Sequence, residues 1–381
     1  MLEGEVVSKN CLAVIINPKP VTFEGGGEKF ALLLGDVLQK EGWNVEFARP
    51  LGRVPSQIDL LVLNGAQGTG LLWARRWIER SKWVWVIPHE ALRQEINMLG
   101  IYPGRLLDEI VAGILPLAFK YWTRHRGRRV TLIAVGQQNA LHLKEWFGTE
   151  PEYIPNGVGN LVFEESSRVR GLLDSIQKKR GNLAAGKWLG LIVSRWDYTK
   201  NPEGIVKIAR STPENVRLIV RSTPDGLFAL RKRLGLLRWP PLTHPRVTWV
   251  EYPLSREEVL ALMRDADFLI LPSKYESFPY VALEAAAVGT LPFLTPVGLG
   301  WEFSKDPLLA RLILPLPPHG RMTASESWQQ ILSVLSDKPL VRELKSALRE
   351  LSMRYSLENW EDRIRRLLYQ DMEKLCDRIS K

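Results

Sequence analysis

Short apolar segments alternate with amphipathic ones along the first half of the chain. The apolar segments are rich in Val, Ile and Leu, and they lie at residues 12–17, 44–47, 59–63, 83–87 and 130–135. Continuous apolar runs of this length are typical of strands buried on both faces. After Gly25–Gly27 the apolar positions recur with helical spacing and fall on one face: Phe30, Leu33, Leu34, Val37 and Leu38. A second helix is expected over 71–79, so this half predicts a parallel sheet covered by helices.

The same alternation starts again in the second half. Further strands are expected at 189–193, 216–220, 247–250, 268–271 and 290–294, and helices at 202–210, 226–234, 256–264 and 280–288. Between the halves, residues 154–187 are polar, charged and interrupted by glycine, and we interpret them as the connection. The pattern predicts an α/β protein with two Rossmann-like, doubly wound parallel-sheet domains at 1–160 and 161–358. A charged amphipathic helical segment, 359–381, follows them.

Length and composition agree with this division. A chain of 381 residues suits two domains, and 45% hydrophobic with 25% charged residues is ordinary for a globular protein. No apolar run is long enough for a membrane-spanning helix, and the first ten residues do not have the pattern of a secretory signal. The two cysteines, Cys11 and Cys376, form neither a disulfide framework nor a metal-binding spacing. We therefore expect a cytoplasmic protein without a metal site.

A net charge of +10 favours an anionic partner. Residues 120–129 contain five Lys or Arg and no acidic residue, with Tyr121 and Trp122 among them. More cations occur earlier in this half: Arg75, Arg76, Arg80 and Lys82. Cations mixed with aromatic residues suit an anionic membrane surface or a nucleic acid. A solvated basic helix face explains the segment equally well.

Two glutamates eight positions apart, Glu276 and Glu284, begin the candidate chemistry. Glu276 follows an expected strand, and Glu284 lies about one turn into the next helix. Ligands of open α/β sheets bind beyond the carboxyl ends of the strands, where helix N-termini favour phosphate. Because a carboxylate repels phosphate, these glutamates are better suited to accept hydrogen bonds from sugar hydroxyls. By spacing alone, two solvated surface carboxylates are the far more common explanation.

Two cations five positions apart, Arg195 and Lys200, lie between another expected strand and a helix that begins at Pro202. This places them at the same edge of the sheet as Glu276. Cleavage of a sugar–phosphate bond builds negative charge on the leaving group, and Arg with Lys can neutralise that charge.

The segment Pro272-Ser … Glu276-Ser-Phe-Pro … Leu283-Glu-Ala resembles the signature of glycosyltransferase family 4 and its retaining GT-B relatives. The resemblance covers residues from about 17 to about 360 and is most specific over 193–302. It implies that Glu276 contacts the donor sugar and Glu284 the ribose, while Arg195 and Lys200 hold the diphosphate.

Other positions match the family with changes. Ser277 replaces a glycine, and Phe278 and Tyr280 would shape the sugar pocket, with packing as the alternative role for Phe278. In the first half, Gly26 and Gly27 correspond to a glycine turn that approaches the donor phosphates or the acceptor. His89 corresponds to a histidine that faces the donor sugar. Asn64 is a departure, because relatives often carry histidine there.

The resemblance implies a retaining, metal-independent glycosyltransferase of the hexosyltransferase type that uses a UDP- or GDP-sugar as co-substrate and no other cofactor. The acceptor would be a carbohydrate or a lipid-linked glycan, and the protein would be cytoplasmic or peripheral on the cytoplasmic membrane face. It also implies that the last helix returns to the N-terminal domain. A nucleotide-sugar epimerase and a nucleic-acid-binding protein on the same scaffold are the alternatives, of which the nucleic-acid partner is disfavoured.

Overall fold

The computed structural model describes residues 11–17, 26–65, 74–89, 129–159, 161, 166–181, 188–224, 226–315 and 324–379. The chain forms two compact units. The N-terminal unit comprises 1–157 together with 357–381, and the C-terminal unit comprises 158–356.

The N-terminal unit contains a six-stranded parallel sheet in the order β2-β1-β3-β4-β5-β6. Five strands match the expected apolar segments: β1 (Leu12–Ile16), β2 (Asn44–Ala48), β3 (Ile58–Asn64), β4 (Ser81–Ile87) and β5 (Arg129–Ala134). The sixth, β6 (Glu152–Tyr153), is too short to be recognised from periodicity. The described helices of this unit are α1 (Gly26–Lys40), α3 (Arg75–Ile78), α6 (Gln137–Phe147) and α15 (Leu357–Ile379).

Both faces of this sheet are covered, as the continuous apolar strands require. Val84 and Val86 of β4 belong to a core that includes Trp77 of α3 and Phe147 of α6. Trp85 points to the opposite face, because side chains alternate along a strand. There its indole Nε1 donates to Asp371 Oδ2 of α15 at 3.0 Å.

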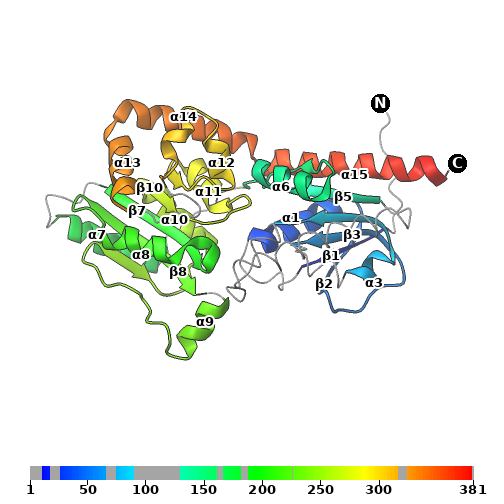
Figure 1. Cartoon of the computed structure of the whole chain (residues 1–381), viewed down its shortest axis with the longest axis horizontal. Helices are drawn as coiled ribbons and strands as arrows, with labels where there is room; N and C mark the ends of the chain where they lie inside the picture. Colours follow the sequence, from blue (N-terminus) through cyan, green and yellow to red (C-terminus); the bar gives the residue numbers. More distant parts are fainter. Residues whose placement is uncertain are drawn as a thin grey trace. The chain divides into compact units, whose positions relative to one another are not determined.

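The long C-terminal helix α15 packs within the N-terminal unit, alongside α1 (Figure 1). The rings of Phe30 in α1 and Trp360 in α15 meet edge to face, with centroids 5.4 Å apart. Arg365 Nε lies 2.9 Å from Glu41 Oε1 just beyond α1. The predicted return of the last helix to the N-terminal domain is confirmed.

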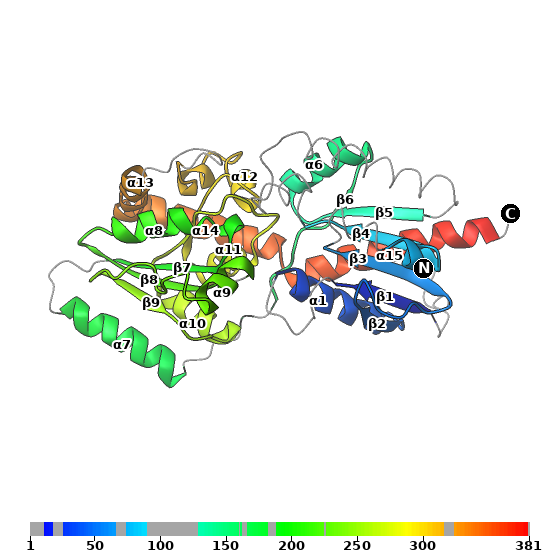
Figure 2. The same ribbon diagram turned by 60° about the horizontal axis from the view of Figure 1, so that its bottom comes forward.

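The C-terminal unit contains a five-stranded parallel sheet in the order β11-β10-β7-β8-β9. Its strands are β7 (Trp188–Trp196), β8 (Val216–Pro224), β9 (Val247–Val250), β10 (Phe268–Leu271) and β11 (Leu291–Leu294). Helices α8 (Pro202–Arg210) and α13 (Ala324–Ser336) cover one face, and α7 (Ser167–Gly181) and α10 (Arg256–Asp265) cover the other (Figure 2). The unit also contains α9 (Gly226–Arg233), α11 (Tyr280–Val288), α12 (Leu299–Phe303) and α14 (Lys338–Arg354).

The expected connection, 154–187, is only partly a linker, because it contains the fifteen-residue helix α7. The polar composition concealed this helix, which buries Val169 completely. Ser166 caps the start of α7 by accepting a hydrogen bond from the Val169 N–H at 3.3 Å. Its hydroxyl also makes a long-range contact, because it donates to Glu258 of α10. This bond lowers the pKa of the Glu258 carboxyl below its usual value. None of the helices within the described residues is long and apolar enough to cross a membrane.

Candidate functional site

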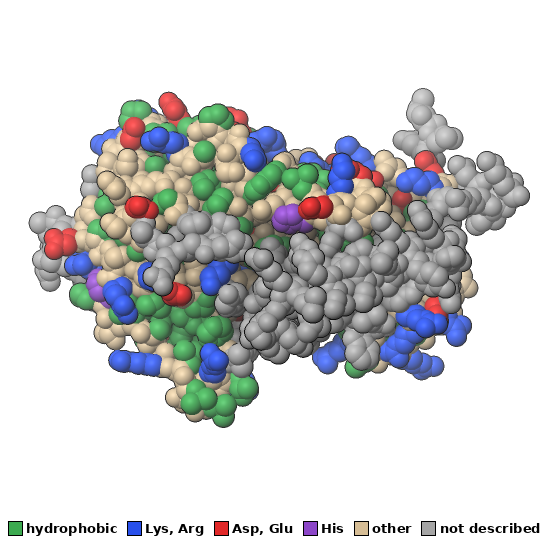
Figure 3. All heavy atoms as spheres, viewed as in Figure 1, with side chains coloured by type: hydrophobic (Ala, Val, Ile, Leu, Met, Phe, Trp, Pro, Cys, Tyr) green, Lys and Arg blue, Asp and Glu red, His purple; other side chains and the backbone are tan. Residues whose placement is uncertain are grey.

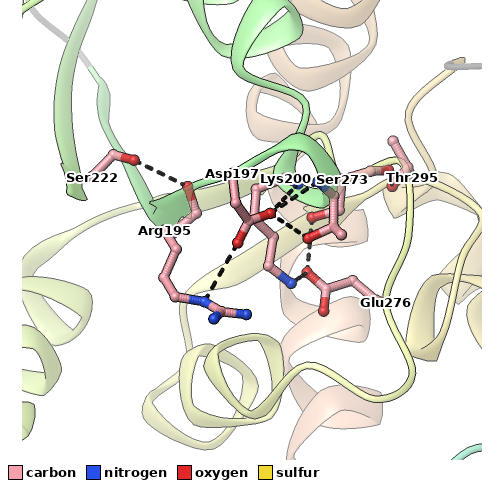
Figure 4. Close-up of polar contacts among 9 residues, drawn as sticks. Arg195, Asp197, Lys200, Ser222, Ser273, Glu276 and Thr295 are labelled. Carbon is pink, nitrogen blue, oxygen red and sulfur yellow. Dashed lines mark hydrogen bonds and ion pairs between the residues drawn. The ribbon is translucent and has the colours of Figure 1, made fainter. Parts of the chain in front are cut away.

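Arg195, Lys200 and Glu276 meet at the carboxyl ends of the neighbouring strands β7 and β10 (Figure 4). Arg195 is the penultimate residue of β7, Lys200 ends the short 3-10 helix η1 (Tyr198–Lys200), and Glu276 lies in the loop after β10. Lys200 Nζ is 2.6 Å from Glu276 Oε1. The two side chains are 17% and 12% exposed, so this ion pair is partly withdrawn from water. The expected proximity of Lys200 and Glu276 is therefore seen in the structure.

Backbone hydrogen bonds hold the two loops together. The N–H groups of Lys274 and Tyr275 both donate to the carbonyl of Thr199, at 2.7 and 3.2 Å. Ser273 Oγ donates to Glu276 Oε1 at 2.8 Å, the same oxygen that Lys200 contacts. Glu276 is thus oriented from two sides before any ligand binds.

Asp197 belongs to this charged cluster, and the sequence analysis did not identify it. Its Oδ1 accepts hydrogen bonds from the backbone N–H of Thr199 at 2.9 Å and of Lys200 at 3.3 Å. Its Oδ2 lies 3.5 Å from Arg195 Nε. One carboxylate therefore shapes the turn that carries Lys200 and pairs with Arg195. The signal was present, since Asp commonly bonds to the backbone two residues later in such turns.

Glu284 lies in the second turn of α11 and pairs with Arg256, the first residue of α10. Arg256 Nε is 2.9 Å from Glu284 Oε1, and the Glu284 side chain is only 9% exposed. A capping box between Ser255 and Glu258 fixes the start of α10 and hence the Arg256 backbone. Arg256 Nη2 is buried and has no hydrogen-bond partner within the described residues. An acceptor carboxylate and a donor guanidinium thus lie side by side, a pair suited to bind hydroxyl groups.

The remaining predicted residues of this unit follow Glu276 closely in the sequence. Phe278 is buried and packs edge to face on Tyr355, with ring centroids 5.1 Å apart, which is the packing role given as its alternative. Burial raises the pKa of the Tyr280 hydroxyl above its usual value, so this group stays protonated. Ser277 is partly exposed. Gly298 has φ +56°, and a Cβ there would lie 2.8 Å from the Glu276 carbonyl oxygen.

The predicted residues of the N-terminal unit form a separate hydrogen-bonded group at the ends of its strands. Asn64 Nδ2 donates to Asn17 Oδ1 at 2.7 Å and to the Gly27 carbonyl at 2.8 Å. This leaves Asn64 Oδ1 facing His89 Nε2 at 2.8 Å, which assigns the imidazole proton to Nε2. Burial lowers the pKa of His89 to about 4, so the ring is neutral at neutral pH. Asn64, the departure from the family pattern, fixes the histidine. Gly26 begins α1, and a Cβ at the next residue, Gly27, would lie 3.6 Å from His89 Cδ2.

Two other expectations concern the basic segment and a metal site. Of the basic segment 120–129, residues 120–128 lie outside the described residues. In the part of the chain that the structure does describe, three or more His, Cys, Asp or Glu side chains do not gather in a group that could hold a metal ion.

Comparison with known proteins relates this site to one family. Curated protein sequences gave no match to the chain. The family model described as glycosyl transferases group 1 matches residues 174–306, the segment that contains Arg195, Lys200, Glu276 and Glu284.

Solved structures resemble both units. Sucrose-phosphate synthase from Thermosynechococcus elongatus is 19% identical with a TM-score of 0.69, covering 96% of this chain and 100% of its own. HepE from Anabaena, in complex with UDP and glucose, is 15% identical with a TM-score of 0.65, covering 94% and 99%. WaaG, a glycosyltransferase involved in lipopolysaccharide biosynthesis, is 16% identical with a TM-score of 0.59, covering 92% and 97%.

The predicted resemblance to GT-B glycosyltransferases is thereby confirmed: the chain has the two-domain GT-B fold of these solved structures, and the segment that carries its charged site matches the model of the glycosyl transferases group 1 family.

Proposed function

We propose that this protein transfers a sugar from a nucleoside diphosphate sugar to an acceptor hydroxyl, with retention at the anomeric carbon. The observation that carries the proposal is the Lys200–Glu276 ion pair of 2.6 Å at the carboxyl ends of β7 and β10, inside the segment that matches the family. The UDP and glucose in the HepE complex support a UDP-sugar as the first donor to test.

The charges of the site suit departure of a nucleoside diphosphate. Arg195 and Lys200 would neutralise the diphosphate as the bond to the anomeric carbon breaks, which makes a metal ion unnecessary. Glu276 carries a negative charge that would repel phosphate, but Lys200 and Ser273 bind its Oε1 and leave Oε2 for a sugar hydroxyl. Glu284 and Arg256 would bind the ribose hydroxyls.

The proposed reaction needs no enzyme nucleophile. The acceptor oxygen bonds to the anomeric carbon on the face that the diphosphate leaves, and the departing phosphate oxygen takes the acceptor proton. His89, neutral and donating from Nε2 to Asn64 Oδ1, could only accept a hydrogen bond from the sugar and would supply no charge. The acceptor proposed is a carbohydrate or lipid-linked glycan, reached from the cytoplasmic side of a membrane.

A donor screen by thermal unfolding tests this proposal. We expect one of the UDP-, GDP- or ADP-sugars to raise the melting temperature of the wild type, and Glu284→Ala to weaken that rise. Glu343→Ala removes an exposed carboxylate from α14 of the same unit and should leave the rise unchanged. The proposal is wrong if none of the nucleotide sugars shifts unfolding, or if both variants respond like the wild type.

A further inference from the structure

The C-terminal unit carries an exposed basic and apolar turn, residues 230–238, that the proposed chemistry does not use. It begins in the last turn of α9 and leads into the loop before β9 (Figure 1). Leu230, Leu234 and Leu236 are 50%, 62% and 73% exposed. In Figure 3, hydrophobic side chains cover the lobe at the position of α9, with Lys and Arg side chains beside them.

The charge of this turn has one sign. Four cations, Arg231, Lys232, Arg233 and Arg238, are exposed, and residues 226–246 contain no Asp or Glu. Among the described residues, none of these four takes part in an ion pair. Cations at a helix C-terminus interact favourably with the helix dipole, which accounts for part of the pattern. It does not account for three exposed leucines among them.

The backbone of the turn is ordered by its own hydrogen bonds. The Leu236 N–H donates to the Arg231 carbonyl at 2.8 Å, and the Gly235 N–H donates to the Lys232 carbonyl at 3.1 Å. With Gly235 at φ +70°, this is a Schellman motif. The apolar residue after such a glycine usually packs back on the helix, but here Leu236 faces solvent.

A tryptophan cluster holds the base of the turn. Trp239 packs edge to face on Trp196 and Trp249, with centroid distances of 4.9 and 5.7 Å. Lys232 Nζ lies over the Trp239 ring at 5.6 Å. The exposed leucines therefore lie on a turn whose base is packed. Trp196 of this cluster directly follows Arg195 of the candidate site in the sequence.

We propose that residues 230–238 form a docking surface for an anionic lipid bilayer. Lipid phosphates would pair with the cations, while Leu234 and Leu236 enter the boundary between head groups and acyl chains. The exposed leucines favour a bilayer over nucleic acid, because a phosphate backbone offers no apolar layer to receive them. This surface is distinct from segment 120–129, and the proposal does not depend on sugar transfer.

Vesicle flotation of the full-length protein tests the proposal. The probes are vesicles of phosphatidylcholine alone and vesicles in which one third of the lipid is phosphatidylglycerol. We expect the wild type to float with the anionic vesicles only, and less at high salt, since ions screen the attraction.

Two variants separate the contributions of charge and apolar contact. Combined Arg231→Gln, Arg233→Gln and Arg238→Gln should weaken partitioning about a hundredfold, from about fivefold per cation. Combined Leu234→Ser and Leu236→Ser should weaken it by about tenfold or more for each leucine. The arginine and leucine substitutions lie at exposed positions, and thermal unfolding checks that each variant is folded.

Matched controls come from α14 of the same unit. Arg342→Gln, Lys345→Gln and Arg349→Gln together remove three exposed cations, and Met353→Ser removes an exposed apolar side chain. Both controls should float like the wild type. The proposal is overturned if the wild type does not bind anionic vesicles, or if the controls lose binding as much as the turn variants. It is also overturned if duplex DNA or RNA binds more tightly than vesicles and only the arginine variant reduces that binding. None of these readouts needs a donor, so failure here leaves the proposed function standing.

Discussion

Gly298 offers a direct test of how the fold positions Glu276. It lies between β11 and α12 with φ +56° and ψ −123°, a backbone conformation that residues other than glycine rarely adopt. A Cβ at this position would be 2.8 Å from the Glu276 carbonyl oxygen and 3.0 Å from the Glu276 Cβ. Gly298→Ala therefore combines backbone strain with a steric clash against the loop that carries the carboxylate.

The expected loss of stability follows from these two effects. Backbone strain costs about 1–3 kcal/mol, and a forced shift of packed atoms costs a similar amount. We expect a decrease in the free energy of unfolding of about 3 kcal/mol, which lowers the melting temperature of a unit of this size by about 10 °C. Because the Glu276 loop must move, donor affinity should fall as well.

Gly289→Ala is the matched control. Gly289 also has positive φ, +84°, but no other atom lies within 4 Å of an added Cβ. This variant carries only the backbone strain, about 1–2 kcal/mol, and should bind the donor normally. Thermal unfolding and donor titration of both variants give the comparison. Equal stability of the two, with donor affinity intact in Gly298→Ala, would refute the reasoning.

Two further predictions concern single polar contacts. Arg256→Gln should lower donor affinity about tenfold, because Glu284, 9% exposed, loses its charged partner at 2.9 Å; titration calorimetry measures this, and unchanged affinity would separate Arg256 from the donor site. The pKa of His89 is about 4 when folded, against about 6.5 unfolded. Below pH 6.5 the unfolded state therefore binds a proton that the folded state does not. The free energy of unfolding falls by at most about 3 kcal/mol as the pH drops from 6.5 towards 4. His89→Gln keeps a donor for Asn64 and should flatten this dependence in denaturant titrations; a dependence as steep as that of the wild type would contradict the assignment.

Much of the fold could be predicted because the strands are continuous apolar runs that alternate with amphipathic helical segments. β9, β10, α8 and α11 have the bounds expected from their sequences. Helix α7 could not be recognised, since only its packing on α10 reveals which side of it is buried. The buried Asp371 is similar: its partners Trp85 and Thr131 are more than 200 positions away in the sequence.

For the candidate site, the sequence could predict which charged side chains lie near one another. A parallel sheet brings the ends of β7 and β10 to one edge, so Lys200 and Glu276 meet. The partners that orient them could not be found in the same way. Arg256 was assigned only to a helix before the glutamate motif, and its contact with Glu284 depends on how α10 packs against α11.

The most direct test of the central claim is calorimetric titration of the donor's nucleoside diphosphate into the wild type, Lys200→Gln and Lys207→Gln. Lys200→Gln removes a cation from the diphosphate and also leaves Glu276 without its charged partner, so affinity should fall by a factor of about 10 to 150. Lys207 is a cation of α8 in the same unit that pairs with Glu203 on the surface, and its variant should bind like the wild type. Equal affinity of all three proteins, or binding by none of them, would contradict a donor site built on Lys200 and Glu276.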